Sequence, residues 1–538
     1  GYRFSLHFVA AMRLMEVNMV CKMKHKVLYI KLLVFLFVII TFMTNISCTQ
    51  KTSSVQTNNE YTPNEKIVLK WMIYGEKSKN SESVFSEFNK KLQEYYPDTT
   101  VEFDIVPYDI YKEKWDMKMA TNEHLDLAWI GNDIFNYTEE VKKGSFMALD
   151  YLLSTYGQEL LAEIPENIWR VQKREGKIYS IPLMGMLYRK DYAVVSSKKH
   201  MNTYGNIQEI GAVNRANYYT NEECYEVLEK YLSSLKAEKN LGTGISSETI
   251  SKIADKGLEG IYGPNSPFVI KIFDNDLKVY NKYELDSYRL FFKTIHDWYE
   301  KGYIRENIEE VLNPKSYDGK RNGSVLFLDE YGEHGVVADR IATEYEAVYE
   351  PLQNYKYISF ECSRNAVALP RTTKNPRRAL EIVNLLNTGK GEAPYKLLVN
   401  GFEGRHFISK GSGQVDRITD ASGKPLYELS QYTLGNVFLN YEKTPGEFEQ
   451  LEQYNKNAIV SPLTGFELDT RMMVLEMSKI DLVVEQYLNT LRLGTSEDWQ
   501  QVYGEFVDKM RQAGSQKVIS EMQKQIDTFK KTKDTKGS

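Results

Sequence analysis

Cysteine is scarce in this chain of 538 residues, which holds only Cys21, Cys48, Cys224 and Cys362. No CxxC pair and no spacing typical of a zinc site occurs among them. The sequence therefore excludes a small fold held together by a framework of disulfides. Cys224 and Cys362 are interpreted as isolated structural cysteines, and a bond between them is left as the alternative.

Positive charge is not in surplus, and the common catalytic motifs are missing. Lys and Arg number 68 against 73 Asp and Glu, so no nucleic-acid partner is expected. There is no His-Glu-x-x-His, no Gly-rich phosphate loop and no Gly-x-Ser-x-Gly elbow. Residues 330–334, Glu-Tyr-Gly-Glu-His, are kept only as a minor alternative metal site. No catalytic residue, metal or cofactor is therefore expected.

Aromatic residues, in contrast, are abundant, with 38 Tyr, 23 Phe and 6 Trp. A tyrosine has a flat apolar face and a polar tip, which suits the binding of sugar rings or peptides. It also fills half-exposed positions in any protein, so the composition is only an indication. The hydrophobic fraction of 42% is typical of a globular protein that buries a core.

The longest apolar run, residues 27–44, lies near the N-terminus, follows several lysines and precedes Ser47-Cys48. This order is typical of a secretory signal. Because Cys48 follows a small residue, the segment resembles a lipoprotein signal in which Cys48 carries the lipid, although Asn45 stands where Leu is usual. A transmembrane anchor is the alternative.

A signal of this kind would begin at Met23, so residues 1–22 are interpreted as an over-extended start and residues 23–47 as the signal peptide. Residues 48–65 are polar and without periodicity, which predicts a flexible tether. This layout predicts a protein that is lipid-anchored to the cell membrane on its extracellular face.

The following segment alternates between strand and helix patterns. Strands are expected at residues 67–75, 101–106 and 126–131. Helices are expected between them, at residues 84–96 and 111–121. The alternation predicts an α/β sheet with parallel pairs, in which ligands bind at the carboxyl ends of the strands.

Several short segments follow one another in an order that is shared with a known family. They are the opening strand, Asp126-Leu-Ala-Trp-Ile-Gly131, residues 141–150 (VKKGSFMALD), residues 175–182 (EGKIYSIP) and residues 366–379 (AVALPRTTKNPRRA). Together they resemble the family 1 extracellular solute-binding proteins, which include sugar receptors such as maltose-binding protein. His124-Leu125 stand where that family usually has Pro.

The C-terminal third resembles the uncharacterised C-terminal domain of a large-lipoprotein branch of this family. The matching segments are residues 400–407 (NGFEGRHF), 435–438 (GNVF), 461–466 (SPLTGF), and Ala513-Gly514 followed by Gln523 and Gln525. With them the resemblance covers residues 66–530. Apolar residues at helical spacing predict core-facing helices at residues 480–491, 499–510 and 518–529.

The resemblance implies a type II periplasmic-binding-protein-like fold, with two discontinuous α/β lobes, a hinge and a helical C-terminal extension. By analogy the chain first crosses near Met184-Gly185-Met186 and returns near Asp329-Glu330-Tyr331-Gly332. The expected first lobe comprises residues 66–184 and 331–392, and the expected second lobe comprises residues 185–330 and 393–538.

Candidate ligand-binding residues follow from the chemistry of sugar recognition, which combines aromatic faces with amides, carboxylates and guanidinium groups. By the resemblance, such groups are expected at strand ends, at the return crossing and in the NGFEGRHF and GNVF segments. The candidates are Tyr74, Trp129, Asn132, Asp133, Glu330, Tyr331, Glu403, Arg405 and Asn436.

Structural roles are equal alternatives for some of these residues. Trp129 could instead seal the lobe, and Glu403 with Arg405 could form an ion pair. The other tryptophans considered are expected in the core, namely Trp71, Trp115, Trp169 and Trp298.

The expected function is that of a monomeric solute-binding lipoprotein that captures a small solute, an oligosaccharide, for the permease subunits of an ABC transporter. Two alternatives are kept. One is a sensor that presents ligand to a membrane kinase, and the other is a secreted carbohydrate-active hydrolase whose paired carboxylates only the fold would reveal.

Overall fold

The computed structural model describes most of the chain from Lys66 onward. The described residues are 66–131, 134–189, 192–237, 247–263, 265–303, 326–329, 335–344, 346–361, 363, 365–411 and 413–536. The expected signal peptide, Cys48 and the tether lie outside them, as do Asn132, Asp133, Glu330 and Tyr331. Within these ranges, every helix is too short or too polar to cross a membrane.

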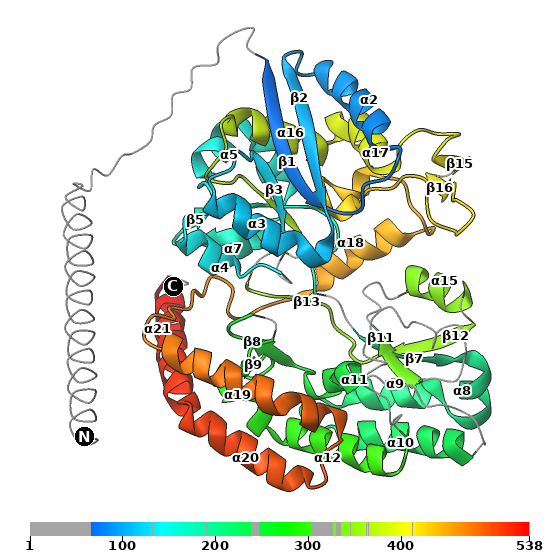
Figure 1. Cartoon of the computed structure of the whole chain (residues 1–538), viewed down its shortest axis with the longest axis vertical. Helices are drawn as coiled ribbons and strands as arrows, with labels where there is room; N and C mark the ends of the chain where they lie inside the picture. The colour runs from blue at the N-terminus through cyan, green and yellow to red at the C-terminus, as the bar shows by residue number, and fades with distance from the viewer. Residues whose placement is uncertain are drawn as a thin grey trace, which may run out of the picture. The chain divides into compact units, whose positions relative to one another are not determined.

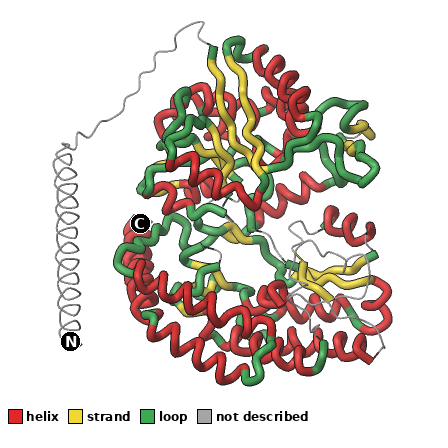
Figure 2. Tube along the Cα trace, in the orientation of Figure 1, coloured by secondary structure: helices red, strands yellow, loops and turns green. Residues whose placement is uncertain are grey.

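The first lobe is built on a sheet whose central strands come from the N-terminal apolar runs. β1 (Ile67–Tyr74) pairs in parallel with β2 (Thr99–Val106) along its whole length, and with β3 (Leu127–Ile130) on its other side. β14 (Ala366–Ala368) pairs antiparallel with both β3 and β6 (Ile181–Pro182). The expected parallel pairs are confirmed, and the strand order over the described residues is β2-β1-β3-β14-β6. Figure 1 labels β2, β1 and β3 of this sheet, and Figure 2 shows its long strands in yellow.

Helices pack around this sheet through apolar stripes at helical spacing. In α2, for example, Val84, Phe88 and Leu92 are fully buried, while the intervening lysines face solvent. The helices of this lobe are α2 (Ser81–Gln93), α3 (Tyr111–Ala120), α4 (Tyr137–Lys142), α5 (Asp150–Tyr156), α6 (Gln158–Glu163), α7 (Glu166–Gln172), α16 (Pro376–Asn387), α17 (Glu392–Asn400) and α18 (Glu447–Asn457). Two short hairpins, β4 (Lys173–Arg174) with β5 (Lys177–Ile178) and β15 (Phe407–Gly411) with β16 (Gln414–Arg417), complete it.

Asp126 joins the N-terminal and returning parts of the first lobe. Its fully buried carboxylate accepts hydrogen bonds from the Lys70 amide on β1 (3.0 Å), from the Thr373 hydroxyl (2.8 Å) and from the Lys374 amide (3.0 Å). The last two donors directly precede α16, so the carboxylate lies at the N-terminal end of that helix, where negative charge is favourable. The family-like segments around residues 126–131 and 366–379 are therefore in direct contact.

The second lobe contains two smaller sheets surrounded by helices (Figure 1). In one sheet β7 (Ala193–Ser197) is the central strand and pairs antiparallel with β11 (Leu326–Asp329) and β12 (Ala347–Pro351). The other sheet has β9 (Phe268–Lys271) between β8 (Leu258–Gly260) and β10 (Tyr280–Asn281). The helices that precede the return crossing are α8 (Lys198–Tyr204), α9 (Ile207–Ala216), α10 (Glu222–Ala237), α11 (Ser247–Ala254), α12 (Asp286–Glu300) and α15 (Val336–Glu344).

The C-terminal helices pack on the core of this second lobe, as predicted. They are α19 (Val474–Leu493), α20 (Trp499–Gln512) and α21 (Ser515–Lys536). Ile480, Phe506 and Met522, one residue from each helix, are fully buried in a cluster that also contains Phe292 and Trp298 of α12. Burial of one apolar face on a common core explains why the periodicity alone located these helices.

The described chain passes between the lobes at three places: between β6 and β7, between β12 and β14, and after α18. A short parallel pair, β13 (Tyr357–Ile358) with β17 (Ile459–Val460), forms where the second and third crossings lie side by side. On the first crossing, Met186, Leu187 and Tyr188 are still buried in the core of the first lobe, and the second-lobe strand β7 begins at Ala193.

The return crossing and one lobe boundary differ from the expectation. β11 and β12 both belong to the sheet of the second lobe, so the chain returns between β12 and β14 instead of near residues 329–332. Residues 393–457 also pack with the first lobe, because Leu398, Tyr427 and Leu451 are buried in its core. The order of the family-like segments indicates the succession of strands and helices. The boundary between the lobes is decided by which of the two cores the side chains of a segment pack into.

A buried carboxylate on β8 ties the crossings to the second lobe. The two oxygens of Glu259 accept hydrogen bonds from the hydroxyls of Tyr357 (2.6 Å), Ser461 (2.6 Å) and Ser359 (3.0 Å). Arg189, on the first crossing, donates its amide to the Tyr357 carbonyl (2.8 Å) and places its guanidinium over the Tyr357 ring. All three crossings therefore meet around Tyr357.

Replacing Asp126 by alanine is expected to lower the free energy of unfolding by about 3 kcal/mol, because several buried donors lose their acceptor. Urea unfolding measures this change. Asp116→Ala, which removes an exposed carboxylate paired with Lys112, is the control and should cost less than about 1 kcal/mol. Equal losses in the two variants would contradict the role given to Asp126.

Candidate functional site

A cavity of about 330 Å³ lies where the first lobe, the second lobe and a crossing segment meet. This volume is at the lower end of the range for small-molecule sites. The first lobe contributes the loop after β3 and the start of α4, and the second lobe contributes the loop between β8 and β9. The lining residues are Ile134, Phe135, Asn136, Tyr137, Thr138, Glu139, Ile261, Tyr262, Gly263, Asn265, Ser266, Pro267, Phe360, Glu361, Leu468 and Asp481.

The first-lobe wall is fixed by the local chemistry of α4. The Asn136 side chain caps this helix by accepting a hydrogen bond from the Glu139 amide (3.2 Å). Tyr137 is buried and donates its hydroxyl to the Gln172 carbonyl (2.9 Å). Because this wall directly follows β3, it lies at the carboxyl end of a parallel strand, as expected for an α/β sheet.

The second-lobe wall is a tight loop that depends on glycine. Gly263 has a φ of +78°, a conformation that other residues adopt at a cost. A side chain at Gly260 would meet the Gly263 carbonyl oxygen at 2.4 Å, so the loop closes tightly on itself. The Gly263 amide donates to Glu361 Oε1 (2.6 Å), which joins this loop to the crossing segment.

Arg174 holds the first lobe to the same crossing from beneath the cavity. Its Nε donates to the Thr138 hydroxyl (2.7 Å), and its Nη2 contacts the carbonyl of Glu361. The guanidinium also lies over the Tyr137 ring, 4.9 Å from its centroid. Arg174 is almost completely buried, so its donors are used within the protein and position the wall.

The charges on the cavity wall are negative. Glu139, Glu361 and Asp481 contribute carboxylates, and no Lys or Arg is among the described residues that line the cavity. Burial, reinforced by the charge of Glu259, raises the pKa of Glu361 to about 7. Burial also raises the pKa of Asp481. The cavity therefore offers hydrogen-bonding oxygens to a ligand but no cation to pair with an acidic group.

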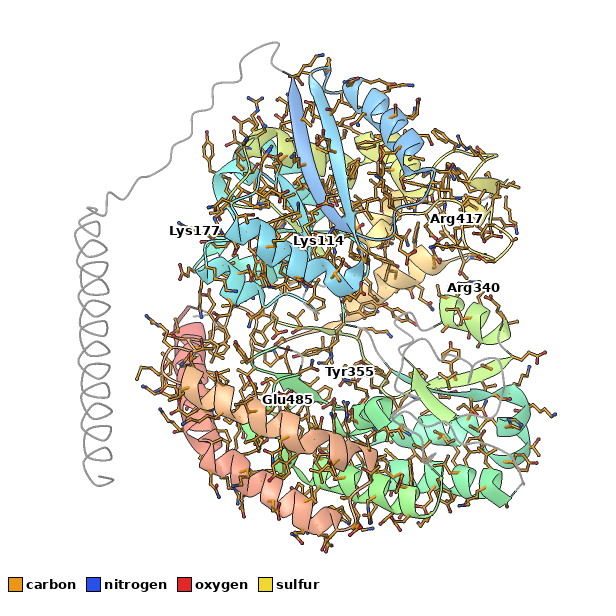
Figure 3. All side chains as sticks on the ribbon, viewed as in Figure 1. Lys114, Lys177, Arg340, Tyr355, Arg417 and Glu485 are labelled. Carbon is orange, nitrogen blue, oxygen red and sulfur yellow. The ribbon has the colours of Figure 1, made fainter. Side chains whose placement is uncertain are left out.

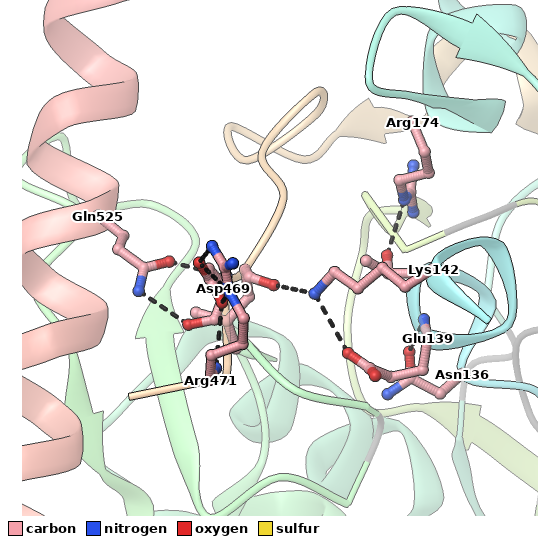
Figure 4. A network of polar contacts seen from close by, with 9 residues as sticks. Asn136, Glu139, Lys142, Arg174, Asp469, Arg471 and Gln525 are labelled. Atoms are coloured by element: carbon pink, nitrogen blue, oxygen red, sulfur yellow. Dashed lines mark hydrogen bonds and ion pairs between the residues drawn. The ribbon is translucent and has the colours of Figure 1, made fainter. Parts of the chain in front are cut away.

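Direct contacts between the lobes lie on both sides of the crossings. Lys142 on α4 donates to the Leu468 carbonyl (2.9 Å) and pairs with Glu139, as Figure 4 shows. At the other contact, Arg340 of α15 donates from Nε to the Thr444 hydroxyl (3.0 Å), and Figure 3 places Arg340 between the lobes. The Lys142 contact lies at the edge of the cavity, because its acceptor, Leu468, is one of the lining residues.

Tyr74 and Trp129 lie in the first lobe outside the cavity lining. Trp129 is 1% exposed, and its Nε1 donates to the Asn365 side chain (3.1 Å). Its ring packs edge-on against Tyr74, with centroids 4.5 Å apart, and Tyr74 also contacts the Ser430 hydroxyl. In this geometry Trp129 seals the strand end, so no face of its ring is open to a ligand.

The C-terminal candidates are also away from the cavity. Glu403 lines a separate surface groove on the first lobe, together with Phe402 and Tyr441. Arg405 is exposed and donates to the Asn80 side chain (2.8 Å), and no ion pair joins it to Glu403 among the described contacts. Asn436 is 2% exposed and caps a short 3₁₀ helix by accepting from the Phe438 amide (3.0 Å). Arg405 and Asn436 thus bond other parts of the first lobe, and Glu403 lines the groove.

Other sequence expectations concern tryptophan, cysteine and metal binding. The four tryptophans expected in the core are buried there, namely Trp71, Trp115, Trp169 and Trp298. Cys224 is free and buried beside the Lys256 amine (3.3 Å). Within the described ranges, no three His, Cys, Asp or Glu side chains are grouped closely enough to hold a metal ion. The segment 330–334 lies entirely outside those ranges.

Several lining residues were not among the candidates predicted from the sequence. The local sequence patterns that could have located them differ in strength. Residues 261–267, Ile-Tyr-Gly-Pro-Asn-Ser-Pro, form a turn-rich run with one aromatic residue, which is typical of a loop between strands. Asn136 follows the predicted β3 rim by only a few positions. Glu361 and Asp481 carry no local signal, because the fold alone brings them to this place.

The two discontinuous lobes, the crossings and the cavity between them define a type II periplasmic-binding-protein-like fold, as the sequence predicted. Residues 462–531 match the family model described as Domain of unknown function (DUF3502). Over an aligned stretch of 481 residues, the chain is 25% identical to a carbohydrate ABC transporter substrate-binding protein of Streptococcus pneumoniae serotype 4. This stretch covers 87% of this chain and 92% of that protein.

Solved structures show the same fold. The crystal structure of the N-glycan transport solute-binding protein NgtS from Streptococcus pneumoniae has a TM-score of 0.71 at 22% identity, over 87% of this chain and 100% of that chain. Its complex with Man1GlcNAc gives a TM-score of 0.66 at 22% identity, over 86% and 99%. Together with the C-terminal match, these likenesses confirm the resemblance to extracellular solute-binding proteins of the branch with an uncharacterised C-terminal domain.

The raised pKa of Glu361 predicts a specific pH dependence of stability. The folded protein holds the Glu361 proton up to about pH 7, whereas an ordinary glutamate releases it near pH 4.5. This contribution to the free energy of unfolding is therefore complete below pH 4.5 and is lost as the pH rises to about 7. Urea unfolding across this range should show a smaller decline for Glu361→Gln than for the unchanged chain.

Glu163→Gln changes an exposed side chain on α6 and serves as the control, which should follow the unchanged chain. A Glu361→Gln variant whose stability declines as steeply as that of the unchanged chain would contradict the assignment.

Proposed function

We propose that this protein captures an uncharged oligosaccharide in the cavity between its lobes and delivers it to the permease of an ABC importer. The observation that carries the proposal is the cavity itself, whose walls come from both lobes and a crossing segment. The proposal is supported by the 25% identical relative, a carbohydrate ABC transporter substrate-binding protein, and by the likeness to NgtS, an N-glycan transport solute-binding protein.

The lining chemistry supports a sugar ligand. Phe135, Tyr262 and Phe360 contribute aromatic groups that suit the apolar faces of sugar rings. Carboxylates accept hydrogen bonds from sugar hydroxyls, and amides such as that of Asn265 both donate and accept. Since Glu361 is half protonated near pH 7, it can accept from one hydroxyl or donate to another.

The charge of the lining supports a ligand without acidic groups. A uronate or a sialylated sugar would bring its carboxylate close to Glu139, Glu361 and Asp481, and like charges in a partly desolvated site repel strongly. The described lining offers no Lys or Arg to compensate this repulsion. A neutral oligosaccharide avoids this repulsion and still uses the carboxylates as acceptors.

Capture requires only a change in the population of closed and open lobes. A ligand that contacts both walls binds the closed arrangement more tightly, and this difference in affinity shifts the equilibrium toward it. Hinge closure of this kind moves the lobes about the few segments that connect them, which here meet at Tyr357. The proposed role requires no catalytic step.

The proposal also includes the location and the partners of the protein. A lipid on Cys48 and the polar tether would hold a monomeric body at the extracellular face of the membrane, close to the permease subunits. Metabolic labelling with a radioactive fatty acid tests the anchor, since Cys48→Ala should abolish incorporation.

Calorimetric titration of the purified chain with neutral and uronic-acid oligosaccharides of equal length tests the ligand class. Tyr262→Ala removes an aromatic face and should weaken binding of a neutral oligosaccharide by about tenfold, which corresponds to about 1.4 kcal/mol. Tyr151→Ala, which changes a tyrosine that is 71% exposed on α5, is the control and should bind normally.

Each outcome of this titration has a distinct meaning. Binding of uronic-acid oligosaccharides with equal affinity would contradict the charge argument and leave the sugar assignment intact. If neither class of oligosaccharide binds, the assignment of a sugar ligand is wrong.

A further inference from the structure

The segment that matches the domain of unknown function borders the cavity. Residues 462–531 begin directly after the third crossing and contain α19, α20 and most of α21. Two residues of this domain, Leu468 in its first loop and Asp481 on α19, line the cavity. The domain is therefore part of the cavity wall as well as of the second-lobe core.

The first loop of the domain is the part that contacts the other lobe. The Leu468 carbonyl accepts the hydrogen bond from Lys142 on α4 (2.9 Å), as described above. The neighbouring Glu467 accepts from the Glu175 amide, in the turn between β4 and β5. Residues 467 and 468 thus contact the first lobe at two separate elements, the β4–β5 turn and α4.

Gln525 on α21 holds this loop in place. Its side-chain Oε1 accepts from the Asp469 amide (2.9 Å), and its Nε2 donates to the Asp469 carbonyl (2.9 Å), as Figure 4 shows. The helix itself is fixed because Met522 and Ile526, on either side of Gln525, are fully buried. Asp469 is also paired with Arg471, so the loop has a defined shape next to the residue that Lys142 binds.

We propose that the C-terminal domain forms the closing wall of the ligand cavity, and that Gln525 is the positioning residue that holds residues 467–469 in the shape that the first lobe binds. This inference rests on the proposed function for its ligand, and on the contacts of Lys142 and Glu175 for its mechanism. It gives the Gln525 carboxamide a role that packing alone does not require, since this side chain bonds a loop and not the core.

The same helix supplies a matched control. Gln523, two positions before Gln525, also bonds a loop through both ends of its side chain, accepting from the Val279 amide (2.7 Å) and contacting the Leu277 carbonyl (3.5 Å). That loop precedes β10 and does not line the cavity. Loss of either glutamine therefore removes similar bonds from the same helix, and only one of the two loops borders the ligand.

The test compares Gln525→Ala and Gln523→Ala in the full chain by thermal unfolding and by calorimetric titration with a neutral oligosaccharide. Both variants should unfold at slightly and similarly lower temperatures. Only Gln525→Ala should raise the Kd, by at least tenfold. A normal Kd for Gln525→Ala, or an equal increase in both variants, would overturn the proposal.

Lys142→Met provides a second variant, which removes the interlobe bond to the Leu468 carbonyl directly, for the case in which Gln525→Ala does not fold. It should also raise the Kd by several fold, and a normal Kd would overturn the proposal. Lys142 is half-exposed, so this change leaves the core of the first lobe intact.

A measurement without ligand separates this inference from the proposed function. If the unchanged chain binds no oligosaccharide, the sugar assignment fails, but hydrogen exchange of α4 in the first lobe still tests the wall. Gln525→Ala should speed exchange in α4, across the lobe boundary, while Gln523→Ala should not. Unchanged exchange of α4 in Gln525→Ala would overturn the proposal.

Discussion

The buried carboxylate of Glu259 is the interaction around which the two lobes are joined. It binds the hydroxyls of Tyr357 on the second crossing and Ser461 on the third, while Arg189 on the first crossing holds the Tyr357 backbone. Burial raises the pKa of Glu259, and the hydroxyl donors partly offset that effect. A buried carboxyl without such donors would be costly. The position of this group therefore fixes where the crossings meet and where the cavity between the lobes can open.

The cavity follows from this arrangement, because it lies beside the crossings and takes one wall from each lobe. Its polar groups are held by the fold before any ligand arrives: Glu361 by the Gly263 amide and Asn136 by its role as a helix cap. Preorganised groups of this kind reduce the entropy cost of binding. The C-terminal domain adds a loop that contacts the first lobe directly and also lines the cavity.

Much of the first lobe could be predicted because its signals are local. The apolar run at residues 67–74 forms a buried strand, and the spacing of Val84, Phe88 and Leu92 gives α2 one apolar face. The C-terminal helices were equally visible in the periodicity. The lobe boundaries were not, because residues 393–457 have no composition of their own that distinguishes packing on one core from packing on the other.

The candidate site shows more clearly the same difference between what local sequence patterns indicate and what the fold decides. Trp129 and Asn436 have the residue types of ligand contacts, yet their neighbours in the fold use them for packing and capping. Glu361 and Asp481, far apart in the chain, meet at the cavity only because a crossing and α19 come together. The sequence by itself determined the succession of strands and helices and the class of fold, since periodicity and short motifs act over neighbouring residues. Only the tertiary structure decided which side chains face the cavity, because burial and contact depend on residues that are distant in the chain.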